Sequence, residues 1–124
     1  MKIEEQVLSR EQMAHLVELG VDTSDASMCW AGDDVVPNNG LALDLGHDGV
    51  PTYTIGDLIE KLPKNIEYYQ LKIDWHDKYV RYLDWYFEQV IGCIGDFSFK
   101  YRPIIEALYD CLCWVAETYK ELIK

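Results

Sequence analysis

The fold is decided by residues 69–86, which read YQLKIDWHDKYVRYLDWY. Apolar and polar side chains alternate over residues 69–76, and the apolar ones are Tyr69, Leu71, Ile73 and Trp75. Alternation with a period of two is typical of a strand that buries one face. Asp77 and Lys78 then supply a tight turn. The stretch therefore predicts a strand over residues 69–76 that turns back into a second segment.

The segment after this turn can be interpreted in two ways. As a helix it places apolar side chains about 3.5 residues apart, at Val80, Leu83, Phe87, Val90 and Ile94. As a strand it returns antiparallel to the first, and its high content of Tyr and Trp favours this choice. We expect a strand through Tyr86 and keep the helix as the alternative for residues 79–94.

Helices are predicted on both sides of this region. Ser9 begins a capping-box sequence, and Gly20 follows the expected end of that short helix. Thr54 caps a second helix, which Pro63 ends, and Pro103 suits the first position of a third. The third helix has one continuous apolar face, made by Ile104, Leu108, Cys111, Leu112, Val115, Tyr119 and Leu122.

Short apolar stretches separated by turn residues occupy the region between the first two helices. They predict three strands, at residues 27–30, 41–45 and 50–53. Asp48 and Gly49 suit a tight hairpin turn between the last two. Residues 32–40 are expected to form a mobile loop.

The length and composition of the chain limit the architectures that it can form. The chain has 124 residues, 49% of them hydrophobic, which is enough for one core without disulfide or metal support. We predict a single compact α+β domain over residues 1–124, with a mainly antiparallel sheet and two or three helices packed on one face.

The net charge of the chain limits the classes of molecule that it can bind. The chain has 22 acidic and 11 basic side chains, a net charge of -11, and residues 1–50 hold ten of the acids and only two of the bases. Such a surface repels phosphate backbones and anionic lipids. We therefore expect no direct nucleic-acid partner and no membrane partner.

Targeting signals and cysteines point to the cytoplasm. No apolar run approaches the length of a membrane span, and residues 1–5 are too acidic to open a signal peptide. The four cysteines contain no C-x-x-C pair, and Cys111 and Cys113 are two apart in a predicted helix, where they do not face each other. We expect free thiols, no cofactor and no structural metal.

Two polar groups are candidates for chemistry. Asp44, His47 and Asp48 surround the predicted hairpin turn and could ligate a divalent cation. Asp74 and His76 are two apart on a predicted strand, so a carboxylate could orient a basic imidazole. Turns and polar strand faces produce both patterns without any function, and we assign no catalytic or metal-binding residue.

Aromatic side chains are concentrated in the second half of the chain. Eleven of the sixteen Phe, Trp and Tyr residues lie between Tyr68 and Tyr101, more than one face of a sheet can bury. Tyr and Trp are enriched at protein interfaces. Stacking of nucleobases is the rival interpretation, although acidic residues among the rings disfavour it. The interaction surface that we predict consists of Tyr68, Tyr79, Tyr82, Trp85 and Tyr86.

Several short motifs resemble a known set of proteins. They are Ser27-Met28-Cys29-Trp30, Pro51-Thr52-Tyr53-Thr54 leading into residues 57–63, Tyr69-x-Leu71-x-Ile73, and residues 103–110 with Leu112-x-Trp114. In these the chain is similar to small uncharacterised proteins of gut bacteria and their prophages, which have no assigned activity. The resemblance implies a compact α+β domain encoded near mobile elements and carries over no functional residue.

Three hypotheses of function follow from these patterns. The first is a non-enzymatic protein-interaction module of phage or mobile-element origin, which binds a protein partner or forms a homodimer. The second is an acidic mimic of nucleic acid that occupies a basic groove on a partner protein. The third is a small metal-binding or hydrolytic enzyme that uses His47 or His76.

Overall fold

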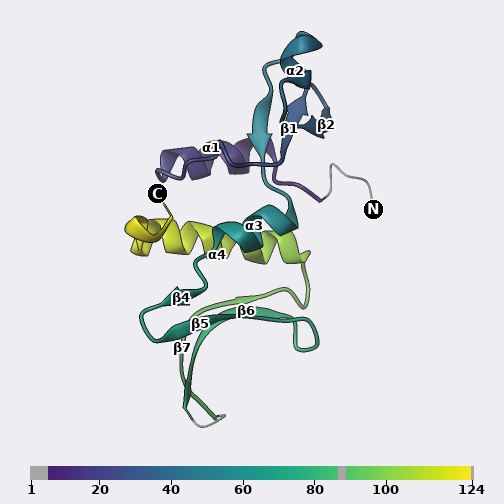
Figure 1. Cartoon of the computed structure of the whole chain (residues 1–124). Helices are drawn as coiled ribbons and strands as arrows, with labels where there is room; N and C mark the ends of the chain where they lie inside the picture. Colours follow the sequence, from purple (N-terminus) through teal and green to yellow (C-terminus); the bar gives the residue numbers. More distant parts are fainter. Residues whose placement is uncertain (1–5, 87–88, 124) are drawn as a thin grey trace.

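The three longest helices form a central layer between two antiparallel sheets (Figure 1). The computed structural model describes residues 6–86 and 89–123. In chain order its elements are α1 (Arg10–Glu18), β1 (Met28–Ala31), β2 (Asp34–Pro37), α2 (Leu41–Asp44), β3 (Val50–Thr52), α3 (Ile55–Lys61), β4 (Asn65–Ile66), β5 (Tyr69–Asp74), β6 (Tyr79–Tyr86), β7 (Gln89–Ser98), α4 (Ile104–Thr118) and η2 (Lys120–Leu122). The predicted α+β class is confirmed, and its antiparallel strands divide between a sheet β2-β1-β3 and a sheet β4-β5-β6-β7.

The predicted strand pair at the centre of the larger sheet is confirmed. Residues 79–86 form strand β6, so the helical alternative is wrong there; Phe87, which that alternative included, lies outside the described residues. The pairs Leu71–Tyr82 and Ile73–Val80 fix the register between β5 and β6. The turn between them is closed by the carboxylate of Asp74, which accepts hydrogen bonds from two backbone amides.

Strand β7 was not predicted from the sequence. It pairs with β6 along its whole length but carries two β-bulges, one at Ile91 and one at Gly95. Gly95 has φ +63, the left-handed conformation that glycine adopts without steric cost. A Cβ atom at this position would lie 2.8 Å from Cζ3 of Trp114, so α4 approaches the β7 backbone directly.

Helix α4 is the centre of the main core. Its Leu108 and Leu112 are fully buried, and the helix packs against β6 and β7 on one side and against α3 and α1 on the other. Trp114 anchors it on the sheet, with its ring centroid 6.0 Å from those of Tyr82 and Phe97. Within the part of the chain that the structure describes, α4 is the longest helix, with 15 residues, and no helix has the length and apolar content to cross a membrane.

Capping boxes begin α1 and α3, as the sequence predicts. Ser9 Oγ accepts a hydrogen bond from the backbone amide of Gln12 at 3.1 Å, and Gln12 Oε1 accepts one from the backbone amide of Ser9. Thr54 and Asp57 make the same reciprocal pair at the start of α3. These contacts satisfy amides that a helix leaves without internal partners, and so they fix where each helix begins.

Two predictions for the smaller sheet are wrong. Residues 41–45, predicted as a strand, contain helix α2, and the region 32–40, predicted as a loop, contains strand β2. Alternating leucines suggested a strand, but Gly40 at φ +93 turns the chain into a helical turn in which Leu45 bonds back to Leu41. The predicted hairpin at Asp48 and Gly49 is therefore absent, and β3 pairs with β1 instead.

The smaller sheet is joined to the rest of the domain near the start of α1. The backbone oxygen of Leu8 accepts hydrogen bonds from the Thr52 hydroxyl at 2.6 Å and from the Trp30 indole at 3.1 Å. Arg10 adds a hydrogen bond to the Gly32 carbonyl at 2.8 Å, and its guanidinium lies 5.9 Å from the Trp30 ring centroid. These contacts hold the smaller sheet in a fixed position beside α1.

Candidate functional site

The strongest candidate surface is the end of the hairpin formed by β6 and β7. This hairpin curves away from α4 and extends beyond it (Figure 1). The main core reaches Tyr82 on β6 and Ile94 on β7. None of the described residues in 84–86 and 89–93 belongs to that core. The hairpin end is thus left uncovered by the helical layer.

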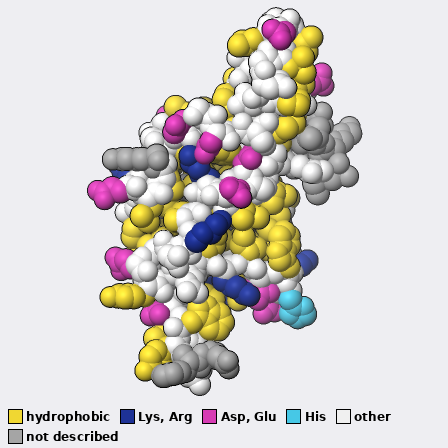
Figure 2. Space-filling model, in the orientation of Figure 1, with side chains coloured by type: hydrophobic (Ala, Val, Ile, Leu, Met, Phe, Trp, Pro, Cys, Tyr) yellow, Lys and Arg dark blue, Asp and Glu magenta, His cyan; other side chains and the backbone are white. Residues whose placement is uncertain are grey.

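Large hydrophobic side chains lie exposed on this end of the sheet. We call them the hairpin-end patch, and they are Tyr68 (83% exposed), Trp85 (44%), Tyr86 (61%), Val90 (47%) and Ile91 (59%). Figure 2 shows a few separate hydrophobic side chains at the lower end of the molecule, among white atoms. At about 200 Å² for a large side chain, these exposed fractions correspond to roughly 600 Å² of mainly apolar surface. Trp85 and Tyr86 are consecutive on β6, so their rings point to opposite faces and the surface is divided between the two faces of the hairpin end. The largest apolar patch on a typical monomer covers about 300–600 Å² and often has a function.

The register explains why these residues share one end of the sheet. Trp85 pairs directly with Val90, and the bulge at Ile91 turns an additional apolar side chain outward next to them. Gln70 on β5 pairs with Leu83 on β6. Tyr68 lies two residues before Gln70, and Trp85 lies two residues after Leu83. Tyr68 therefore belongs to the same end of the sheet as the hairpin residues.

Charge is distributed unevenly between the two sheets. Residues 63–102, which contain the whole larger sheet, carry six acidic and six basic side chains. Residues 1–62 carry twelve acidic and only three basic ones. The balance does not extend to the hairpin end, because residues 84–93 carry two acidic side chains and no basic one.

Two of the five aromatic residues predicted for an interaction surface are not exposed. Tyr82 is fully buried, and its hydroxyl donates a hydrogen bond to the Pro63 carbonyl at 2.8 Å, so its assignment to a surface is wrong. It shares the face of β6 that α4 covers. Tyr79 is half-buried, and the Arg81 guanidinium lies 3.9 Å from its ring centroid. The other three, Tyr68, Trp85 and Tyr86, are exposed in the hairpin-end patch.

The structure does not assemble a cation site around His47. Asp48 forms an ion pair with Arg10 at 3.2 Å, and the His47 ring lies close to Gly32, 3.3 Å from the position of a Cβ atom there. Asp44 is exposed on α2. Among the described residues, no group of three or more His, Cys, Asp or Glu side chains is arranged to hold a metal ion.

Asp74 and His76 are not arranged as a carboxylate and a base. Asp74 Oδ1 lies 2.9 Å from the backbone amides of His76 and Asp77, and the hydrogen bond from the Asp77 amide is the main reason that the pKa of Asp74 is lowered. The carboxylate thus stabilises the turn through the backbone. His76 itself is exposed in that turn.

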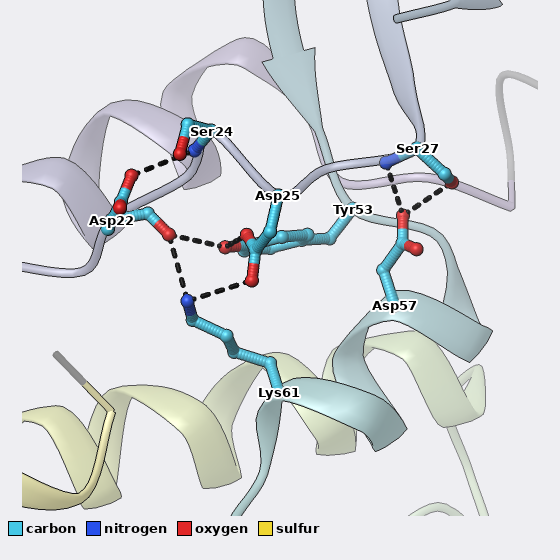
Figure 3. Close-up of polar contacts among 7 residues, drawn as sticks. All are labelled: Asp22, Ser24, Asp25, Ser27, Tyr53, Asp57 and Lys61. Carbon is cyan, nitrogen blue, oxygen red and sulfur yellow. Dashed lines mark hydrogen bonds and ion pairs between the residues drawn. The ribbon is translucent and has the colours of Figure 1, made fainter.

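A polar network that the sequence did not reveal connects the loop after α1 with α3 (Figure 3). The Tyr53 hydroxyl lies 2.7 Å from Asp25 Oδ1 and 3.0 Å from the Asp22 carbonyl oxygen. Lys61 Nζ donates to Asp25 Oδ2 and to the same Asp22 carbonyl, both at 2.9 Å. Nearby, Asp57 accepts hydrogen bonds from the amide and hydroxyl of Ser27. No local motif could predict this network, because its members come from distant parts of the sequence.

This network lies in a groove of about 440 Å³ that Glu60 and Leu122 also line. Burial, followed by the hydrogen bond to Asp25, raises the pKa of Tyr53 far above its ordinary value, so the phenol stays protonated. The Lys61 ammonium is bonded to the Asp25 carboxylate. A neutral phenol and a paired lysine hold the loop against α3, and we interpret the network as structural.

Comparisons of the chain with protein-family models, with curated proteins and with solved structures find no match.

Proposed function

We propose that this protein is a non-enzymatic interaction module that binds another protein through the hairpin-end patch. The observation that carries the proposal is the exposure of Trp85, Val90 and Ile91 on a hairpin that extends past the helical layer. Exposed aromatic and aliphatic side chains surrounded by polar ones are typical of protein interfaces. Little side-chain entropy is lost when a Trp or Tyr ring is covered by a partner.

The other two hypotheses have less support. A mimic of nucleic acid needs free carboxylates spaced over one surface, but Asp25 and Asp57 are engaged with Lys61 and Ser27. An enzyme that uses His47 or His76 needs a second group to orient the imidazole. The nearby carboxylates considered for chemistry with these histidines, Asp48 and Asp74, bond to other groups.

The proposal includes a cytoplasmic location and an origin in a phage or other mobile element. Free thiols at all four cysteines are the usual state in a reducing compartment. The origin depends on the resemblance in sequence described above.

Photo-crosslinking in the native host cell tests the proposed function. We would replace Ile91 with p-benzoylphenylalanine and, as a matched control, replace Leu43, which is 68% exposed on α2 at the opposite end of the molecule. The expected result is a discrete protein adduct from position 91 that is lost when Trp85→Ser and Val90→Ser are added. Absence of any protein adduct from position 91, or equal adducts from both positions, would refute the proposal.

A further inference from the structure

We propose that two adjoining grooves beside η2 bind a segment of a partner protein that carries Lys or Arg side chains. The larger groove, of about 520 Å³, lies between β4 and the end of α4 (Figure 1). The groove that holds the Tyr53 network (Figure 3) adjoins it, because Leu122 lines both. None of the residues of the hairpin-end patch lines either groove, so this second surface does not depend on the proposed function.

The lining of the larger groove matches a long basic side chain. It combines three apolar side chains with three acidic ones, which are Ile66, Tyr119, Leu122, Glu67, Glu117 and Glu121. The methylene stem of a Lys or Arg packs on apolar surface while its charged head reaches a carboxylate. The guanidinium of Arg also stacks on aromatic rings such as that of Tyr119.

The charge of the two grooves favours a cationic occupant. Each is lined by three acidic side chains and one basic side chain among the described residues. One of the two bases, Lys61, is already paired with Asp25. Four of the acids have carboxylates that accept no hydrogen bond and form no ion pair within the described part of the chain, and they are Glu60, Glu67, Glu117 and Glu121. These carboxylates are available to a partner of opposite charge, which electrostatic complementarity would steer to this surface.

Two of these glutamates occupy positions where another residue type would be more stable. Glu117 lies in the last turn of α4, at the end of the helix that carries a partial negative charge, and that turn contains no basic side chain. Glu67 has φ +55 in the turn between β4 and β5, a left-handed conformation that favours glycine or asparagine. Such departures from local preference are expected where a residue serves binding. A bound cation would relieve the repulsion at the end of α4.

Fluorescence anisotropy with a labelled probe peptide tests the proposal on the full chain. In an extended peptide alternate side chains face the same way, so a probe of about eight residues in which Arg alternates with Ala presents its guanidinium groups on one side. We expect a dissociation constant of about 10–500 µM at low salt. Binding should weaken about tenfold between about 50 mM and about 500 mM NaCl, because salt screens the attraction. The same peptide with citrulline, a neutral analogue of Arg, should not bind.

Substitutions identify the surface. Glu67→Gln with Glu117→Gln should raise the dissociation constant of the Arg peptide about fivefold or more. The matched control is Asp33→Asn with Asp44→Asn, which removes the same net charge from exposed positions near the smaller sheet and should raise it less than about twofold. Glu117→Gln alone should leave Tm unchanged or slightly higher, because it removes a negative charge from the negative end of α4. A purely structural role for Glu117 predicts a lower Tm.

Three results would overturn the proposal. The first is an equal loss of affinity in the Asp33 and Asp44 variant, because the chain would then attract the probe through its net charge alone. The others are equal binding of the Arg and citrulline peptides, and no binding of the Arg peptide at low salt. Trp85→Ser with Val90→Ser should leave the affinity for the Arg peptide unchanged. The grooves and the hairpin-end patch are therefore tested separately, since the adduct from position 91 reports only on the patch.

Discussion

Gly95→Ala should be among the most damaging single-methyl additions in this protein. Gly95 has φ +63, and a non-glycine residue in this left-handed conformation costs roughly 1–2 kcal/mol. The added Cβ would also lie 2.8 Å from Cζ3 and 3.0 Å from Cη2 of Trp114, and overpacking of this kind costs roughly 1–3 kcal/mol. We expect a loss of about 3 kcal/mol in the free energy of unfolding, equivalent to about 10 °C in Tm for a domain of this size.

Gly20→Ala is the matched control, because it separates the backbone cost from the clash. Gly20 has φ +89, but nothing lies within 4 Å of a Cβ atom built there. Its substitution should cost only the backbone part, about 1 kcal/mol. Urea denaturation of both variants gives the comparison directly. If Gly95→Ala costs no more than Gly20→Ala, the close approach of Trp114 to β7 is not as the structure has it.

A double-mutant cycle supplies a second test of the same contact. In a Trp114→Leu background the ring that the new methyl group meets is gone. Gly95→Ala should then cost about as much as Gly20→Ala, so the two substitutions should be coupled by about 1–2 kcal/mol. Additive costs would contradict the reasoning.

Three further predictions concern polar contacts. Tyr53→Phe removes the hydroxyl that bonds to Asp25 but leaves the ion pair of Asp25 intact, and it should lower the free energy of unfolding by about 1–3 kcal/mol in urea denaturation. Asp74 has a lowered pKa in the folded state, so its stabilising effect is present above the pKa of an unfolded aspartate, about 4, and is lost as the pH falls through the lower folded value. Asp74→Ala should therefore flatten the decline of stability below about pH 4, and Asp44→Ala serves as the comparison at an exposed carboxylate. Arg10→Ala should cost about 1 kcal/mol and speed amide hydrogen exchange in β1 and β2 more than in β5 and β6, because Arg10 links the smaller sheet to α1; equal acceleration in both sheets would contradict this role.

The elements that the sequence predicted correctly are those whose signals come from residues close together in the sequence. Alternation predicted β5, and aromatic content after a turn favoured β6 over the helical alternative. Helices α1 and α3 were evident from Ser9 and Thr54, whose capping contacts involve residues three positions away. Strand β7 was missed because Gly92 and Gly95 interrupt its pattern. Its bulges also place apolar and polar side chains out of simple alternation. Helix α2 was mistaken for a strand because four residues are too few to distinguish the two periods.

The candidate surface was predicted only in part, for a related reason. Aromatic density drew attention to Tyr68, Trp85 and Tyr86, but density does not tell which ring faces the helical layer. Tyr82 and Trp85 are three positions apart on β6, so their side chains point to opposite faces of the sheet. Tyr82 lies on the face that α4 covers. The aliphatic members Val90 and Ile91 could not be assigned to a surface while β7 itself was unrecognised.

The bulges of β7 connect the stability of the fold to the exposure of its candidate surface. Gly95 lets Trp114 lie directly on the strand, which brings α4 close to the sheet at that point. Bulges increase the local bend and twist of a strand, and beyond them the hairpin departs from α4 (Figure 1). Trp85 and Val90 face away from α4 whatever the bend of the strand, because Trp85 has the opposite parity to Tyr82 along β6. The irregularity that hid β7 from sequence patterns therefore coincides with the point at which the hairpin leaves the helical layer.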